Sequence, residues 1–140
     1  MHSVQGLGQA DRREIEPGGI VESICEFFAE RIAALTAAGV QRSRLILDPG
    51  MGFFLGANPH TSFAALRGLL QIKARFDLPL FVSVSRKSFL GAVTERPVGE
   101  RGPATLAAEL YAARQGADMV RTHDVRALKD ALRVQAELGE

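Results

Sequence analysis

Three short apolar runs in the sequence each end abruptly in polar or charged residues. The first run ends at Asp48, the second at Ser85-Arg86-Lys87-Ser88, and the third at Arg121-Thr122-His123-Asp124. Roughly 37 residues separate Asp48 from Ser85, and about as many separate Ser85 from Arg121, close to the length of a strand, a crossover helix and a return strand. Parallel strands bring their carboxyl ends to one edge, where α/β proteins place their ligand sites. The spacing therefore predicts one site that combines a carboxylate, several cations and two hydroxyls.

Asp48 follows three aliphatic residues and precedes Pro49-Gly50, so its carboxylate should emerge beside a sharp turn. Two interpretations stay open from these residues alone. In the first, the carboxylate holds the turn by accepting hydrogen bonds from backbone amides. In the second, it accepts hydrogen bonds from a ligand, and its two oxygens suit a heterocycle with neighbouring amino and ring N–H donors.

The second cluster places two cations and two hydroxyls after an apolar strand, a stretch that is costly to bury without a polar ligand. Lys87 offers a compact ammonium group for carbonyl or phosphate oxygens, and Arg86 can stack on an aromatic face or form an ion pair. In the third cluster, Arg121 and His123 alternate as in a strand and should project on one side, where they would suit a diphosphate. A solvated turn and an ordinary surface pair are the alternatives for these two clusters.

The loop after Asp48 contains Gly52 and an apolar stretch, Phe53-Phe54-Leu55, which we interpret as a lip over the site. The loop lacks the third glycine of a dinucleotide-binding motif, and the sequence has neither a Walker loop nor a G-x-S-x-G nucleophile motif. Three scattered histidines and a single cysteine have no metal-ligand spacing, so the residues predict no metal site. We expect Cys25 to be a buried apolar residue and His60 to face solvent.

Length and charge limit the possible classes of protein. The 140 residues fit one domain but are too few for a complete (β/α)8 barrel, which needs about 200. The net charge of +1 gives no reason to expect a nucleic-acid partner. No apolar stretch approaches the roughly 20 residues of a membrane span, and the amino terminus has no charged segment followed by an apolar one. We therefore expect a cytoplasmic protein with no membrane partner.

Apolar periodicity and capping residues predict alternating helices and strands. Strict alternation favours an α/β fold with parallel strands and right-handed crossovers. Residues 3–19 are predicted to be irregular and solvated, and a loop is predicted between Ser88 and Pro103. The helices are expected over about 19–38, from Asn58-Pro59 to about 76, from Pro103 to Gly116 with Leu106 and Leu110 on one face, and after an N-cap at Asp124; the strands are expected at 45–47, 81–84 and 117–122.

The stretches 47–53, 84–88 and 120–124 together closely resemble the later strand-end motifs of the dihydropteroate synthase family, in the same order and spacing. Met1-His2-Ser3 is similar to the end of that family's fifth strand. The resemblance implies that residues 1–140 form the C-terminal half of a (β/α)8 TIM barrel. In folate biosynthesis, the family joins 6-hydroxymethyl-7,8-dihydropterin diphosphate to p-aminobenzoate and releases diphosphate.

The resemblance also implies a role for each candidate residue. In the family, diphosphate departs to leave a pterin-stabilised methylene cation, so cations near the leaving group lower the barrier. The loop at 51–58 is longer and less basic than usual and resembles that of the mobile, sulfonamide-insensitive enzymes, which predicts an aminobenzoate pocket reshaped against sulfonamides. The implied catalytic residues are Lys87, Arg121 and His123; the implied substrate-binding residues are Asp48 and Lys87 for the pterin, Ser85, Arg86 and Ser88 for the aminobenzoate side, Gly52 and Phe53 in the loop, and Arg121 and His123 for the diphosphate.

The family's first four strands have no counterpart in these residues. The ligands of the Mg2+ ion that the family implies are therefore expected in that other half, and the full-length form is expected to be a homodimer. A half barrel has two open edges and an uncovered apolar face, so we expect the isolated chain to self-associate and to be inactive or nearly so. Two other classes stay open: a non-catalytic remnant that keeps an anion- or pterin-binding pocket, and another phosphate-binding β/α enzyme.

Overall fold

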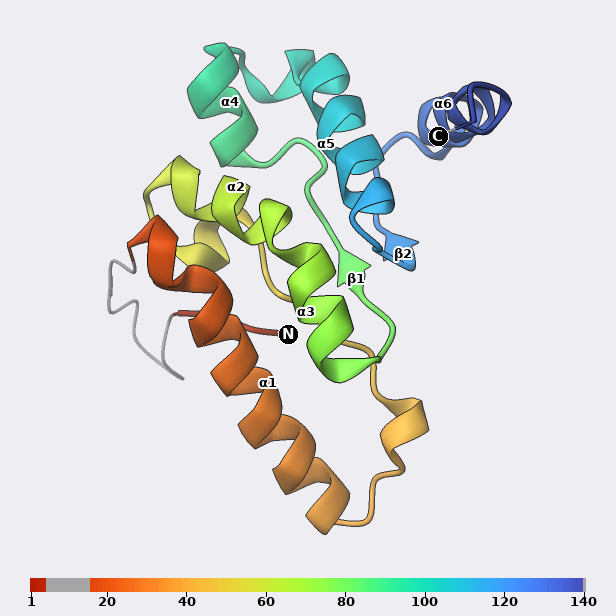
Figure 1. Ribbon diagram of the computed structural model, residues 1–140. Coiled ribbons are helices and arrows are strands. Elements are labelled where there is room, and N and C mark those ends of the chain that lie inside the picture. Colours follow the sequence, from red (N-terminus) through yellow and green to blue (C-terminus); the bar gives the residue numbers. More distant parts are fainter. Residues whose placement is uncertain (5–15, 140) are drawn as a thin grey trace.

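Short parallel strands alternate with helices in the computed structural model, which describes residues 1–4 and 16–139 (Figure 1). Strand β1 (Phe81–Val82) pairs in parallel with β2 (Met119–Val120), with Phe81 opposite Met119. Leu47 forms a single parallel bridge to Leu80. His2 N–H in turn donates to the Asp48 carbonyl at 2.7 Å. The four segments therefore lie side by side in the order 1–3, 47–48, 80–82 and 119–121, which agrees with the half barrel that the resemblance implies.

The strands are shorter than the predicted ranges 45–47, 81–84 and 117–122. The Leu80 N–H donates to the Asp118 carboxylate at 2.7 Å instead of to a backbone carbonyl. A 3-10 turn at Arg42–Arg44 takes up the Leu45 N–H, which donates to the Arg42 carbonyl at 3.0 Å, so the segment 45–47 joins the sheet only at Leu47. A side-chain bond and a turn bond thus take the place of ladder bonds at Leu80 and Leu45.

The helices have well-defined ends. Asn58 caps α2 by accepting His60 N–H at 2.9 Å, and Asp124 caps α6 by accepting Ala127 N–H at 3.0 Å, which confirms both predicted caps. The predicted helix over about 19–38 is confirmed as α1. The helices are α1 (Ile20–Ala37), α2 (Pro59–Arg67), α3 (Leu69–Phe76), α4 (Ser88–Thr94), α5 (Gly102–Arg114) and α6 (Val125–Glu137), and further 3-10 turns lie at Pro17–Gly19, Gly52–Leu55 and Val98–Glu100.

The prediction of one helix up to residue 76 was wrong, because α2 and α3 are separated at Gly68. A Cβ atom at Gly68 would lie 2.4 Å from Val21 Cγ2, so the close approach of α1 leaves room only for glycine. The predicted loop after Ser88 was also wrong in its first half. Residues Ser88–Thr94 form α4, which buries Phe89 and Leu90 in the core.

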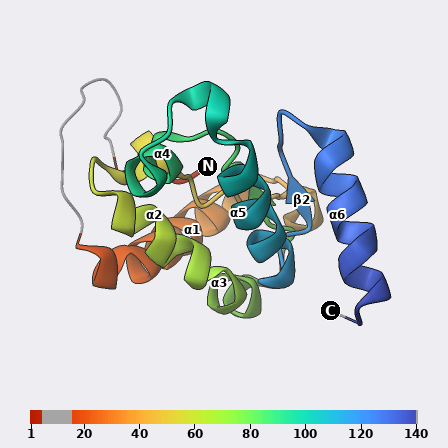
Figure 2. The same ribbon diagram turned by 90° about the horizontal axis from the view of Figure 1, so that it is seen from above.

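Helix α5 buries other residues than Leu106 and Leu110, which were predicted to share one face. Leu106 and Leu110 are only half-buried, whereas Thr105, Ala108, Glu109 and Ala112 are buried. Apolar residues of α1, α2 and α3 pack with the strands into one core that includes the fully buried Cys25. Helix α6 lies beyond α5, far from α1, in both views (Figures 1 and 2).

Of the segment 3–19, predicted to be irregular, residues 5–15 lie outside the described part of the chain. None of the described helices combines the length and apolarity needed to cross a bilayer.

Candidate functional site

Lys87 is at the centre of a cluster at the carboxyl end of β1. Its Nζ donates to the Met51 carbonyl at 2.7 Å and lies 5.1 Å from the centroid of the Phe54 ring. Burial lowers the pKa of Lys87, the charge of Asp48 raises it, and the charge of Arg121 lowers it. Because both charges act on one ammonium group, the structure brings Asp48, Lys87 and Arg121 into one electrostatic site at the strand ends.

The loop after Asp48 is shaped to approach this lysine. Gly52 has φ +65°, and a Cβ atom there would lie 3.1 Å from Lys87 Cδ. Asp48 Oδ1 accepts Gly50 N–H at 2.9 Å, so the turn-holding interpretation is confirmed for one oxygen. A carboxylate has further acceptor capacity, so this bond is compatible with a second role in ligand binding.

Ser85 and His123 form a second cluster next to the first. Ser85 is 6% exposed, and its Oγ accepts His123 N–H at 3.1 Å and lies 2.8 Å from His123 Nδ1. A neutral imidazole whose Nδ1 accepts the Ser85 hydroxyl carries its proton on Nε2. With Nδ1 engaged, Nε2 is the ring nitrogen that is left for a ligand.

Other candidate residues lie at the rim. The Arg86 side chain is exposed, while its backbone has φ +59° and its N–H donates to Thr105 Oγ1 at 2.9 Å. Ser88 is exposed at the start of α4 and lines, with Gly52, a cavity of about 80 Å3. Phe53 is 66% exposed and its ring packs edge-on against Phe54. Ser88 and Gly52 are thus brought together, whereas Arg86 and Phe53 project toward solvent.

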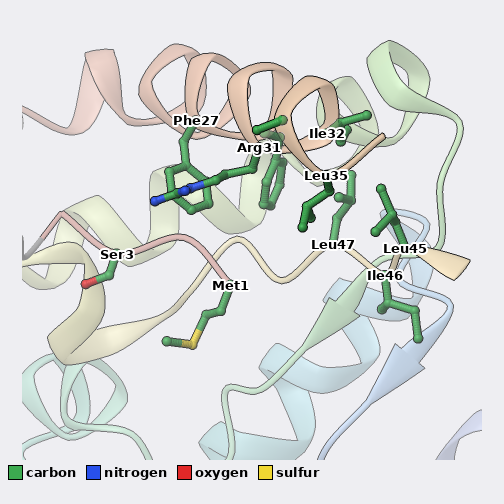
Figure 3. A pocket seen from close by; sticks show the side chains of 11 residues that line it. Met1, Ser3, Phe27, Arg31, Ile32, Leu35, Leu45, Ile46 and Leu47 are labelled. Atoms are coloured by element: carbon green, nitrogen blue, oxygen red, sulfur yellow. The ribbon is translucent and has the colours of Figure 1, made fainter. Parts of the chain in front are cut away.

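One large hollow among the described residues does not coincide with this site. It has a volume of about 690 Å3 and lies between α1, the strand segment at 45–47 and the amino-terminal residues (Figure 3). Its lining is mostly apolar and contains none of the predicted site residues. A cavity of about 310 Å3, in contrast, is lined by Ser85, Arg86 and His123 together with residues of α5.

Two buried polar residues near the site were not predicted from the sequence. His2 is 3% exposed, with Nδ1 3.2 Å from the Pro49 carbonyl, and burial lowers its pKa. Glu109 is buried on α5 beside Thr122. The sequence did contain a signal for the burial of Glu109. It follows Thr105 by four positions and precedes Ala112 by three, so all three residues share one face of the helix. The amino-terminal position of His2 carried no comparable signal, apart from the resemblance to a strand end.

Comparisons with known proteins match this arrangement. A family model described as pterin binding enzyme matches residues 1–123. The type-2 dihydropteroate synthase of Escherichia coli is 60% identical over 140 residues, covering 100% of this chain and 51% of the relative. Among solved structures, dihydropteroate synthase from Stenotrophomonas maltophilia superposes with a TM-score of 0.88 at 30% identity, covering 99% of this chain and 51% of that one. The Xanthomonas albilineans enzyme with 4-aminobenzoic acid superposes with a TM-score of 0.84 at 31% identity, covering 99% and 48%.

The chain spans about half the length of the relatives that it matches. Its fold is the α/β arrangement of those barrel enzymes, with parallel strands in the order described above. Since the family model covers most of the residues, including all three strand-end clusters up to His123, the chain belongs to the family of pterin binding enzymes.

Proposed function

We propose that residues 1–140 form one partial barrel that supplies the pterin and diphosphate side of a dihydropteroate synthase, a transferase of folate biosynthesis. Its substrates are 6-hydroxymethyl-7,8-dihydropterin diphosphate and p-aminobenzoate. The observation that carries the proposal is the parallel pairing that brings the strand ends at Asp48, Lys87 and Arg121 to one edge, where the charges of Asp48 and Arg121 both act on the pKa of Lys87. The cytoplasmic location expected from the sequence remains part of the proposal.

Each charged group has a distinct task in this reaction. Asp48 accepts hydrogen bonds from the amino and ring N–H groups of the pterin, and Lys87 donates to a pterin acceptor. Arg121 and His123 Nε2 hold the diphosphate, which leaves with the electron pair of the broken C–O bond. The amine of p-aminobenzoate then forms the C–N bond to the methylene carbon and loses a proton. No covalent bond to the protein is needed.

Magnesium enters the proposal only through the family. In the described ranges 1–4 and 16–139, no group of three or more His, Cys, Asp or Glu side chains is placed to hold a metal ion. The described residues therefore do not form a metal site by themselves, and we assign no step to a metal. Ligands for magnesium are expected from the part of the barrel that this chain does not match.

The loop rim supports a proposal about inhibitors. Ser85, Arg86 and Ser88 would face p-aminobenzoate, and the exposed ring of Phe53 projects from the loop next to this side. We expect the bulky loop to narrow the pocket against sulfonamides while it admits the smaller substrate. The measurement is sulfonamide inhibition of a full-length enzyme that carries this loop, compared with Phe53→Gly. Equal inhibition of both enzymes would contradict the expectation.

Exposed apolar residues support the proposal that the chain does not work alone. Met1 and Ile46 line the 690 Å3 hollow and are 58% and 55% exposed. We expect another part of a barrel to cover this hollow, the isolated chain to self-associate with little or no activity, and the complete enzyme to be a homodimer. Sedimentation of the isolated chain tests this, and a monodisperse monomer that forms pteroate would contradict it.

Calorimetric titration of the pterin diphosphate tests the proposed function. The titration is made into this chain alone and into a mixture with the first half of the Escherichia coli type-2 relative as a separate polypeptide. Binding in the mixture that is lost with Lys87→Met supports the proposal. Binding in neither sample would refute it and favour a non-catalytic remnant, and binding of sugar phosphates without pterins would favour another β/α enzyme.

A further inference from the structure

Glu109 on α5 is a buried acid that the proposed mechanism does not use. Glu109 is 1% exposed, and its Oε1 has no hydrogen-bond partner among the residues that the structure describes. The side chain lines the 310 Å3 cavity together with Thr122 and His123. A buried carboxyl group with incomplete hydrogen bonding is costly, so its place in the helix calls for a physical reason.

Glu109 is connected to the segment that follows β2. The Glu109 and Thr122 side chains line the same 310 Å3 cavity, and the Thr122 hydroxyl lowers the pKa of the acid as a hydrogen-bond donor does. The same hydroxyl oxygen accepts Asp124 N–H at 3.1 Å. From the other side, Ser85 Oγ accepts His123 N–H at 3.1 Å. The segment 121–124 is therefore held between α5 and the end of β1.

The environment disfavours the charged form of this acid. Burial raises the pKa of Glu109 and the charge of Asp124 raises it too, while the bond from Thr122 lowers it. A neutral carboxyl group can accept the Thr122 hydrogen bond without adding negative charge beside a diphosphate. A permanently ionised group at this position would oppose the binding of that anion.

We propose that Glu109 is a positioning residue that acts through Thr122 to set the backbone of residues 121–124 and thereby the direction of Arg121 and His123. The inference rests on the proposed function for the identity of the ligand, a diphosphate group. The arrangement of His123 itself does not depend on that ligand. The positioning role of Glu109 and the identity of the ligand can therefore be tested separately.

The first test follows the imidazole of His123 by long-range 1H–15N spectra of the complete 140-residue chain. The three histidine signals are assigned with His60→Gln and His123→Gln. Glu109→Leu and Thr122→Val should each shift the His123 nitrogens toward an average of the two tautomers, and the double variant should shift them no further. Glu109→Gln, which keeps an oxygen acceptor for Thr122, should restore the wild-type signals.

Two controls separate positioning from general stability. Leucine replaces an incompletely bonded acid, so Glu109→Leu should not lower the melting temperature. Thr94→Val removes a hydroxyl that is bonded to Leu90 O within α4, and it should leave His123 unchanged. If Glu109→Leu fails to fold, the His123 signals of Thr122→Val and Glu109→Gln still test the positioning role. Unchanged His123 signals in Thr122→Val would overturn the inference.

The second test measures diphosphate binding by the complemented barrel described above. Loss of one positioning hydrogen bond should weaken binding by roughly three- to tenfold in Glu109→Leu, and Glu109→Gln should recover it. Undiminished binding in Glu109→Leu would overturn the inference. If the wild-type mixture binds no diphosphate, the proposed function fails, and the His123 spectra alone decide the role of Glu109.

Discussion

Gly50, in the turn after Asp48, should not tolerate a side chain. Its φ is +74°, and a Cβ atom there would lie 2.4 Å from the His2 carbonyl oxygen and 3.3 Å from Phe54 Cβ. The His2 backbone cannot retreat freely, because its N–H donates to the Asp48 carbonyl at 2.7 Å. Gly50→Ala should therefore displace the amino-terminal segment from the strand edge.

The expected cost of Gly50→Ala has three parts. A left-handed backbone costs an alanine about 1–2 kcal/mol relative to glycine. Overpacking against the His2 peptide costs roughly 1–3 kcal/mol. Loss of the bond from His2 to Asp48 costs about 0.5–1.5 kcal/mol. We expect a total loss of roughly 3–6 kcal/mol in the free energy of unfolding, a large share of the stability of an ordinary domain.

Urea denaturation followed by circular dichroism measures this loss, and Gly39→Ala is the matched control. Gly39 has φ +89° but no atom within 4 Å of the added Cβ, so its substitution should cost only the backbone strain of about 1–2 kcal/mol. The difference between the two variants isolates the contact with His2. If the two variants lose the same stability to within about 0.5 kcal/mol, the docking of residues 1–3 beside Asp48 is refuted.

Three further predictions concern groups in or next to the site. Lys87→Met should be compared with the wild type by urea denaturation at several pH values. Because the pKa of Lys87 is lower in the folded protein than in the unfolded chain, the wild type should gain stability over the variant as pH rises toward 10.5. The gain should be at most about 1.4 kcal/mol per pH unit. A difference between the wild type and Lys87→Met that falls as pH rises would contradict the burial of the Lys87 ammonium group. Asp118→Asn should remove the ion pair to Lys73, which together with the Leu80 N–H lowers the pKa of Asp118. The wild type should therefore be more stable than the variant above pH 3.8, and this difference in stability should vanish in acid titrations below pH 3.8. A difference that persists when Asp118 is fully protonated would argue against the ion pair. Ser85→Ala should cost about 1–2 kcal/mol in thermal denaturation and change the tautomer of His123, and an unaltered imidazole spectrum would show that Ser85 does not orient the ring.

The local sequence determined several helix ends and the order of the strands. Asn58 and Asp124 are caps because their short side chains bond backbone amides within three residues, which needs no tertiary contact. The meeting of Asp48, Lys87 and Arg121 was also predictable. Each follows an apolar strand, and parallel strands place their carboxyl ends at one edge.

Tertiary contacts decided the features that local sequence does not encode. Gly68, where α2 and α3 are separated, has no room for a side chain because Val21 of another helix packs against it, and no local pattern shows such a neighbour. The burial of His2 likewise depends on the Asp48 and Pro49 carbonyls, which are remote in the chain. Periodicity reports which face of an element is apolar, whereas contacts between elements depend on how those faces meet. Only the folded chain could therefore place Glu109 next to Thr122, and with it the positioning role proposed above.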